Sequence, residues 1–420
     1  MLEIIKNFLS NLKPDIIVRA PSRINLINPL DAVEGDFWMP SVAIHGKKNP
    51  LSAFLYIKKV SEENRLKIYS IDNLKVTCSI TLESEINLLK NLAGDLKDLG
   101  GKERLVCESI NRLITVNSNF KERYLRSSIE IGLLTTIPLQ SGLGGSTAII
   151  IAVLYGLACY FDLYNNLNDI KESEVPINKD IIAEIATKVE DENLKITAGY
   201  SDRYVISRGG LGFCSYVGKL YHKEISNEPL AVYDRIDKTY EIHDLPILIC
   251  FSGVTHESGD VHGKLRKLYL QENPQILVYY STLAEISWKS RFAFMKHDWK
   301  CLGDFFRENT KIMNKIMKTA GFEFGIGLIN NILIKIIEEN PDVYAAKLTG
   351  AGNGGSVFAL VNPDRIESVL NYWKMKLREI TKNRNLFTSK FPSYPIDIIK
   401  NLENAQFYQI KIDKDGVKKI

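Results

Sequence analysis

The sequence predicts an α+β fold with two domains, and three observations support this prediction. The chain has 420 residues, which is enough to bury two hydrophobic cores. Strand-like and helix-like segments are mixed along it, without the regular alternation that is typical of parallel α/β sheets. A polar, weakly periodic stretch runs between Lys223 and Asp244. We therefore expect one domain over residues 1–230 and a second over residues 231–420.

The first half is expected to begin with strands and to continue with helices. Apolar alternation and β-branched residues predict strands at 15–20, 53–58, 66–71, 75–82 and 128–137. We expect the second, third and fourth of these strands to form a meander. Apolar residues at helical spacing, or in a long buried run, predict helices at 103–115, 149–160 and 181–190.

The second half reads as one buried strand, three helices and two further strands. The strand is expected over residues 245–251, and the helices over 263–270, 276–296 and 302–320. Two strands at 344–348 and 356–361 flank a glycine-rich turn at 349–355.

Composition excludes several classes of protein. Hydrophobic residues make up 45% of the chain and charged residues 25%, which is ordinary for a globular protein. The net charge of +4 is spread along the sequence, so nothing indicates a nucleic-acid partner. Six scattered cysteines without a Cys-x-x-Cys pair predict free thiols in a reducing compartment. The longest uncharged apolar run, 148–161, is too short to span a bilayer. We expect a cytoplasmic monomer or homodimer without a membrane partner.

The most informative segment is Pro138-Leu-Gln-Ser-Gly-Leu-Gly-Gly-Ser-Thr-Ala148. It joins a predicted strand to a predicted helix, which is a place where a polyphosphate can bind. Glycines let the backbone approach an anion, and the helix N-terminus offers N–H groups and the positive end of its dipole. Ser146 adds a hydroxyl suited to a phosphate-bound Mg²⁺. The segment lacks the spacing of a Walker A loop or of a Rossmann loop, and by itself it could equally be a tight structural turn.

Four segments, taken in order, resemble the GHMP kinase family of galactokinase, homoserine kinase, mevalonate kinase and phosphomevalonate kinase. They are Ala-Pro-Ser-Arg-Ile-Asn-Leu-Ile-Asn-Pro-Leu-Asp at 20–31, the glycine-rich loop, Glu190 with Ala-Gly-Tyr-Ser-Asp-Arg at 198–203, and Lys-Leu-Thr-Gly-Ala-Gly-Asn-Gly-Gly at 347–355. The resemblance spans roughly residues 17–360. Strings at 28–31, 138–146, 198–203, 209–211 and 258–266 are most similar to sugar kinases of the glucuronokinase and heptose-phosphate kinase type.

The resemblance implies a fold and a set of ligands. The fold would be an N-terminal domain like domain 2 of ribosomal protein S5 and a C-terminal ferredoxin-like domain. The cofactors would be ATP and Mg²⁺, with the acceptor a hydroxyl of a sugar, sugar acid or sugar phosphate, by analogy the anomeric C1 hydroxyl. Two alternatives stay open: an isoprenoid-pathway kinase of the mevalonate or phosphomevalonate type, and a non-catalytic sugar-sensing homologue.

The resemblance also assigns roles to residues. The loop that would hold the ATP phosphates comprises Leu139, Gln140, Ser141, Gly142, Leu143, Gly144, Gly145, Ser146 and Thr147. Ser146 and Glu190 would meet Mg²⁺, and Asp202 would be the general base. The substrate would contact Arg23, Asn28, Asp31, Asp202 and Arg203. The turn behind the phosphate loop would comprise Lys347, Thr349, Gly350, Ala351, Gly352, Gly354 and Gly355.

The chemistry of these residue types fits phosphoryl transfer, which needs positioning and charge neutralisation more than covalent help. A sugar hydroxyl is a weak acid, so a carboxylate such as Asp202 would accept its proton late in the reaction. Arg23 would favour the ionised carboxylate as an adjacent cation. Ordinary explanations compete: Asp202 could cap a helix, Arg23 could form a surface ion pair, and Glu190 could sit at a solvated helix end.

Overall fold

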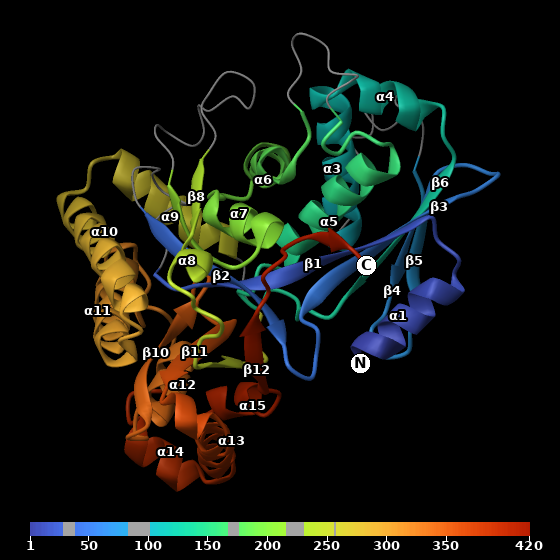
Figure 1. Ribbon diagram of the computed structural model, residues 1–420. Coiled ribbons are helices and arrows are strands. Elements are labelled where there is room, and N and C mark those ends of the chain that lie inside the picture. Colours follow the sequence, from blue (N-terminus) through green and yellow to red (C-terminus); the bar gives the residue numbers. More distant parts are fainter. Residues whose placement is uncertain (28–37, 83–100, 167–175, 216–230, 256–257) are drawn as a thin grey trace.

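The fold of the chain is given by a computed structural model (Figure 1), which describes residues 1–27, 38–82, 101–166, 176–215, 231–255 and 258–420. Helices and strands are mixed, as the predicted α+β class requires. The strands form one long sheet path in the described part of the chain, in the order β10-β11-β9-β12-β2-β1-β3-β6-β4-β5. Their bounds are β1 Ile16–Asn25, β2 Met39–Gly46, β3 Ser52–Lys59, β4 Arg65–Tyr69, β5 Val76–Thr81, β6 Ile129–Thr135, β9 Ile247–Phe251, β10 Val343–Thr349, β11 Ser356–Val361 and β12 Gln406–Ile412.

The predicted meander is wrong, because β6 lies between β3 and β4. It pairs antiparallel with β3 and parallel with β4, while β5 pairs with β4 at the edge of the sheet. Alternation in a sequence reports which face of a strand is buried, but it does not name the partner strand. Burial explains the order: β6 is buried over Ile129–Leu134, whereas alternate residues of β5 are exposed. The strand with two buried faces takes the interior position.

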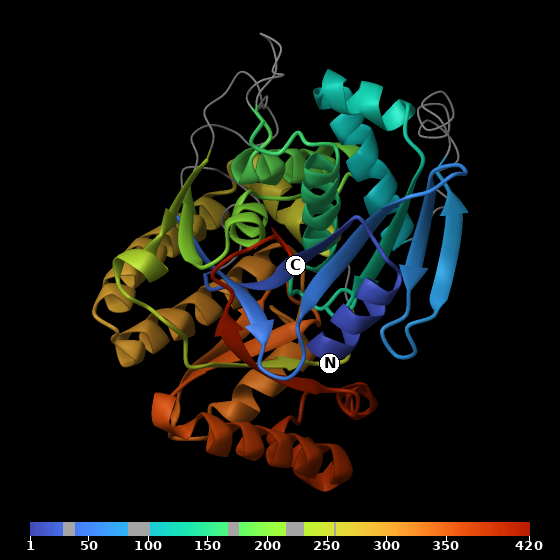
Figure 2. The same cartoon turned by 45° about the vertical axis from the view of Figure 1, so that its right-hand side comes forward.

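Helices cover both faces of the first half of the sheet. On one face lies α5 (Gly145–Tyr160), which is almost wholly buried and has α3 (Lys102–Val116), α6 (Lys179–Lys188) and α7 (Ser201–Arg208) packed against it. On the other face, α1 (Leu2–Asn11) covers Phe54 and Tyr56 of β3 with Ile5 and Leu9. Alternate residues of β3 thus serve two different cores. Figure 2 shows α1 and α5 on opposite sides of the sheet.

The second half builds its own helical layers around β9, β10, β11 and β12. Helices α10 (Pro274–Met295) and α11 (Trp299–Thr319) form an antiparallel hairpin, and α11 packs on β10. Helices α12 (Leu328–Ile337) and α13 (Ile366–Lys382) lie lower in Figure 1. The remaining described elements are α4 Ser118–Leu125, a π-helix at Val189–Asn193, β7 Leu211–Ser215, β8 Val232–Arg235, α8 Ile236–Thr239, α9 Ser258–Leu270, a 3₁₀ turn at Pro363–Arg365, α14 Arg384–Lys390, α15 Ile398–Leu402 and β13 Lys418–Lys419.

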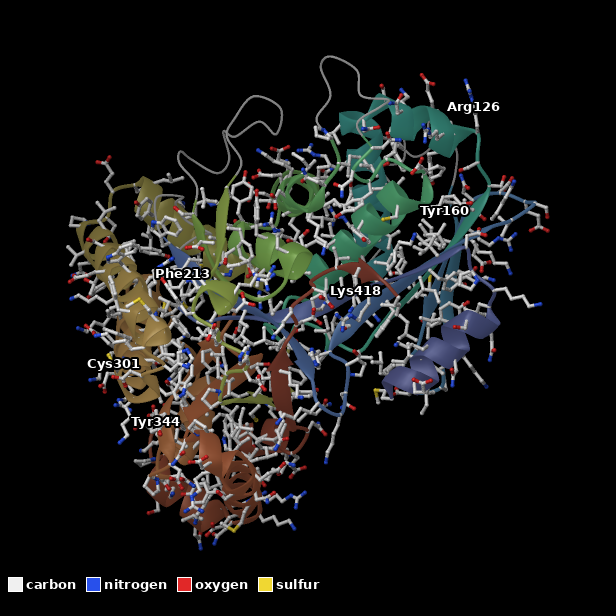
Figure 3. The ribbon with its side chains drawn as sticks, viewed as in Figure 1. Arg126, Tyr160, Phe213, Cys301, Tyr344 and Lys418 are labelled. Atoms are coloured by element: carbon white, nitrogen blue, oxygen red, sulfur yellow. The ribbon has the colours of Figure 1, made fainter. Side chains whose placement is uncertain are left out.

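Strand β12 joins the two halves. It pairs antiparallel with β2 on one side and with β9 on the other, so a segment near residue 410 closes the sheet between them. Beyond it, β13 pairs with β1, and Figure 3 shows Lys418 of this segment beside that strand. The guanidinium of Arg19 on β1 forms a buried ion pair with Asp413. The domain boundary near residue 230 stays a prediction.

Strand β1 changes partners at Pro21, and this change positions the site. Residues 16–21 pair with β3, whereas Ser22–Asn25 pair with β2. Proline has no N–H to donate to a ladder, so it is tolerated where the partner changes. The second segment carries Arg23 and Asn25 toward the glycine-rich loop.

Among the described residues, none of the helices combines the length and apolar character needed to cross a bilayer.

Candidate functional site

The glycine-rich loop between β6 and α5 has the backbone expected of an anion site. Gly142 and Gly144 have φ of +72° and +77°, and α5 begins at Gly145 directly after them. The first N–H groups of a helix have no partner within it, and the dipole makes this end positive. Leu139 and Gln140 are exposed and Ser146 is half-buried, so the loop is accessible from solvent.

Strand β1 holds the loop by its carbonyl groups. Arg23 Nη1 donates to the carbonyl of Gly142 at 2.6 Å, and Ser22 Oγ donates to that of Leu143 at 2.7 Å. The C=O and N–H of a trans peptide point in opposite directions. The N–H groups of Leu143 and Gly144 therefore point away from β1, where they can meet a phosphate.

The turn that follows β10 packs against the back of this loop. A Cβ atom on Gly142 would lie 2.6 Å from the carbonyl oxygen of Thr349, and one on Gly350 would lie 2.8 Å from Gly142 Cα. Asn330 of α12 braces the turn: its Nδ2 donates to Gly354 O at 2.9 Å and its Oδ1 accepts from Gly354 N at 2.8 Å. Two segments far apart in sequence thus meet in close backbone contact, and Thr349 Oγ1 also lies 3.5 Å from Gly142 O.

Lys347 belongs to a different environment from the glycines that follow it. Its Nζ lies 5.0 Å from the ring centroid of Phe358 and 5.9 Å from that of Phe306, and it donates to Leu348 O at 3.0 Å. Burial lowers the pKa of its ammonium group well below the usual range. These contacts place Lys347 in the core of the second half.

Asp202 lies in the first turn of α7 and pairs with Arg23. Its Oδ2 is 2.5 Å from Arg23 Nη2, and both residues are buried. The N-cap of α7 is Tyr200, so Asp202 does not cap this helix, and the Arg23 ion pair is not on the surface. Asp202 Oδ1 is buried and has no hydrogen-bond partner among the described residues. A buried carboxylate oxygen without a partner, beside the glycine-rich loop, is positioned to accept a proton or hydrogen bond from a ligand.

Glu190 lies against the start of α5. Its side chain is buried, so it is not at a solvated helix end. Oε1 accepts from Ser146 Oγ at 2.8 Å and Oε2 accepts from Thr147 Oγ1 at 3.1 Å. A hydroxyl and a carboxylate at a helix N-terminus suit Mg²⁺, which is commonly held by one or two carboxylates together with substrate phosphates. Within the described ranges, no cluster of three or more His, Cys, Asp or Glu forms a metal cage.

Arg203 contacts the carboxylates of both Glu190 and Asp202. Its guanidinium forms a buried ion pair with Glu190, and Nη1 lies 3.7 Å from Asp202 Oδ2. The same Nη1 donates to Gly199 O at 2.8 Å. Arg203 was expected to meet the substrate; the structure shows it paired with both carboxylates, and its contact with a substrate stays a prediction. Asn28 and Asp31, also expected to meet the substrate, lie outside the described residues.

A chain of hydroxyls that the sequence did not reveal ties α7 to the strands. Ser41 Oγ lies 2.5 Å from Ser201 Oγ and donates to Asn25 Oδ1 at 2.9 Å. The N–H of Asn25 donates to Thr349 Oγ1 at 3.2 Å. Ser41 belongs to no motif, and it lies in β2, a strand that was not predicted. No local pattern therefore pointed to this serine.

The fold and the site together define a two-domain α+β protein in which a glycine-rich loop lies at a helix N-terminus, beside a buried carboxylate paired with an arginine. Residues 110–210 match the family model described as GHMP kinases N terminal domain, and residues 293–378 match GHMP kinases C terminal. The chain therefore matches both domain models of the GHMP kinase family, in the order N terminal and C terminal. The predicted family and fold class are confirmed.

Curated relatives and solved structures agree with this assignment. The chain is 28% identical to probable glucuronokinase 2 of Arabidopsis thaliana over 56% of this chain and 57% of the relative. It is 24% identical to D-glycero-alpha-D-manno-heptose 7-phosphate kinase of Campylobacter jejuni over 57% of this chain and 62% of the relative. Thus less than two thirds of either relative is matched. The fold is similar to that of Methanococcus jannaschii mevalonate kinase, with a TM-score of 0.59, 16% identity and coverage of 95% and 98%.

Proposed function

We propose that this protein transfers the γ-phosphoryl group of ATP to a hydroxyl of a sugar, sugar acid or sugar phosphate. The proposal rests on the environment of the Asp202 carboxylate. Its Oδ1 has no hydrogen-bond partner among the described residues, and its Oδ2 pairs with Arg23. The same arginine holds the carbonyl of Gly142, so one side chain fixes the carboxylate relative to the phosphate loop. Phosphoryl transfer depends on such positioning of nucleophile and phosphate.

In the proposed mechanism, Asp202 accepts one proton while one O–P bond forms and another breaks. The acceptor hydroxyl donates a hydrogen bond to Asp202 Oδ1 and lies in line with the γ-phosphorus. As its oxygen forms the new O–P bond and the bond to the β-phosphate oxygen breaks, the proton moves to Asp202. ADP leaves with the electron pair of the broken bond. The N–H groups of Leu143 and Gly144 and the N-terminus of α5 stabilise phosphate charge.

Mg²⁺ fits the residues at the start of α5. Ser146 Oγ and the carboxylate of Glu190 would hold it, since their oxygens lie 2.8 Å apart at a helix end that also binds phosphate. When bound, the ion would neutralise charge on the β- and γ-phosphates. Arg203 pairs with Glu190 from within the protein and so helps to fix the direction of this carboxylate.

The acceptor class rests on the relatives. Glucuronokinase and heptose-phosphate kinase are named for a sugar acid and a sugar phosphate. By analogy we propose the anomeric C1 hydroxyl as the acceptor. Mevalonate kinases also occur among the curated relatives and the similar structures, so a mevalonate-type acceptor is the second candidate.

The test is release of ADP from Mg·ATP in the presence of sugars, uronic acids, heptose phosphates and mevalonate. We expect a sugar-type acceptor to give turnover and ³¹P NMR to locate the new phosphate. Asp202→Asn should lower kcat by about 10²–10⁴-fold with little change in nucleotide affinity. Asp180→Asn is the matched control, because Asp180 pairs with Arg208 away from the loop.

Each other outcome has a definite meaning. Turnover with mevalonate alone would show that the protein is a kinase of the isoprenoid type. Full activity of Asp202→Asn would show that Asp202 is not the general base. Binding of ATP and a sugar without turnover supports the non-catalytic sensor.

A further inference from the structure

Three consecutive carboxylates follow one another in the π-helix at Val189–Asn193, and each pairs with a different arginine. The pairs are Glu190 with Arg203 of α7, Asp191 with Arg266 of α9 and Glu192 with Arg112 of α3. π-Helical turns are rare and are frequent at functional sites. Adjacent like charges repel, so the three arginines from three helices, with Lys188 as a second partner of Glu192, hold the carboxylates in different directions.

Arg266 contacts more of this region than a single ion pair requires. Its Nη1 donates to Asp191 Oδ1 at 2.8 Å, and its Nη2 donates to the carbonyl of Ala198 at 2.9 Å. The side chains of Arg266 and Asp191 are 12% and 11% exposed. The planar guanidinium therefore holds both ends of the segment 191–198 at once.

That segment connects the two carboxylates of the site. It starts directly after Glu190 and ends shortly before Asp202. Asp191 Oδ1 also accepts from Ala198 N at 3.2 Å, and Ile196 N donates to Glu190 O at 2.8 Å. The segment is thus a closed loop, and Arg266 is the side chain that fastens it to α9, a helix of the second half.

We propose that Arg266 is a positioning residue for phosphoryl transfer. Acting through Asp191 and Ala198, it fixes the direction of Glu190 relative to Ser146 and the separation of Glu190 from Asp202. The inference rests on the proposed function. Its consequence is that α9 controls how well the start of α5 holds metal-bound nucleotide.

The test uses Arg266→Gln and Arg266→Lys, with Arg291→Gln as the matched control. Arg291 also joins two elements through an aspartate, in this case Asp234 of β8. Titration calorimetry would compare Mg·ADP with ADP in EDTA. We expect Arg266→Gln to weaken Mg·ADP about tenfold, while metal-free ADP changes less than about twofold. Arg266→Lys should recover part of the loss, because an ammonium can keep the Asp191 contact but not both contacts.

Turnover supplies a second readout. We expect kcat of Arg266→Gln to fall about tenfold or more, with KM for the acceptor nearly unchanged. Asp191→Asn keeps the shape of its side chain and should give the same pattern, and combining it with Arg266→Gln should add no further loss. This second variant keeps the test valid even if Arg266→Gln folds poorly.

The failures of the inference and of the proposed function are distinct. Equal weakening of ADP with and without metal, or a profile like that of Arg291→Gln, overturns the inference alone. A wild-type protein that binds no Mg-nucleotide overturns both. A wild-type protein that binds Mg·ADP without turnover overturns the kinase activity, and the calorimetric comparison still decides the role of Arg266.

Discussion

Gly142 of the glycine-rich loop and Gly350 of the turn after β10 lie backbone to backbone. Both have φ near the left-handed region, at +72° and +82°, and a Cβ on either would overlap the other segment. The contact explains why glycine occurs in two motifs at once: each glycine makes room for the other.

Gly142→Ala should therefore disturb the loop more than its backbone conformation alone predicts. We expect a loss of about 1–2 kcal/mol from positive φ and a further 1–3 kcal/mol from overlap with Thr349 O. Gly321→Ala is the control, because Gly321 has φ +89° but nothing within 4 Å of its Cβ position. Urea unfolding and the KM for ATP measure the difference. Equal losses in both variants would show that the contact with the turn is unimportant.

The ion pair between Arg23 and Asp202 should show strong coupling. Arg23→Gln leaves the buried Asp202 carboxylate with only its longer 3.7 Å contact to Arg203 and should lower the free energy of unfolding by about 3–5 kcal/mol. Adding Asp202→Asn removes that charge, so the double variant should lose less than the sum, by about 0.5–3 kcal/mol. Denaturant unfolding of the four proteins measures the coupling, and strictly additive losses would contradict the observed pair.

Ser146→Ala should change the Mg²⁺ dependence of the reaction. We expect the half-saturating Mg²⁺ concentration to rise about tenfold, because one oxygen beside Glu190 is lost. Ser146→Thr retains the hydroxyl and should restore most of the affinity. Ser109→Ala is the control, since that buried helical hydroxyl donates only to its own helix, at Leu105 O. An unchanged Mg²⁺ profile in Ser146→Ala would remove the serine from the metal site.

Lys347 should make the free energy of unfolding increase with pH in the alkaline range. Its folded-state pKa lies well below 10.5, so between that pKa and about 10.4 the unfolded chain binds a proton that the folded chain lacks. Stability therefore rises with pH in this window, by at most about 1.4 kcal/mol per pH unit. Lys347→Met should abolish this rise and be more stable than the wild type at pH 7. Unfolding curves between pH 7 and 9.5 test this, with exposed Lys315→Met as the control. Parallel curves for wild type and Lys347→Met would contradict it.

Local sequence patterns predicted most elements but not their partners. The run from Ile149 to Tyr160 is apolar on every side, and it became the buried helix α5. Ile247–Phe251 and, after Ser356, the run to Val361 are likewise apolar and became interior strands. By contrast, β6 inserts between β3 and β4 because of burial on both faces, which no alternation pattern reports.

The functional site shows the same difference between local patterns, which could be predicted, and long-range contacts, which could not. The glycine-rich loop could be recognised because its glycines, its place before a helix and its serine are local features. Arg23, Asp202 and Glu190 could be named only through the family resemblance, and their contacts depend on three separate elements. Asn330 and Ser41 contact site residues from distant parts of the chain, with no local pattern to indicate them. Arg266 ends the string at 258–266 that resembles sugar kinases, but that string does not indicate its partners Asp191 and Ala198. Lys347 adjoins the same motif as Thr349, yet its side chain points into a different core.

The buried ion pair of Arg19 with Asp413 joins residues 394 positions apart. On a ribosome that adds about 5–20 residues per second, the partner of Arg19 is made about 20–80 s after Arg19 itself. Until then β12 is also missing, and β2 and β9 both present an open edge to solvent or to other nascent chains. Co-translational folding of this protein thus involves a long interval with unpaired strand edges, in which chaperone binding and aggregation compete for the same backbone.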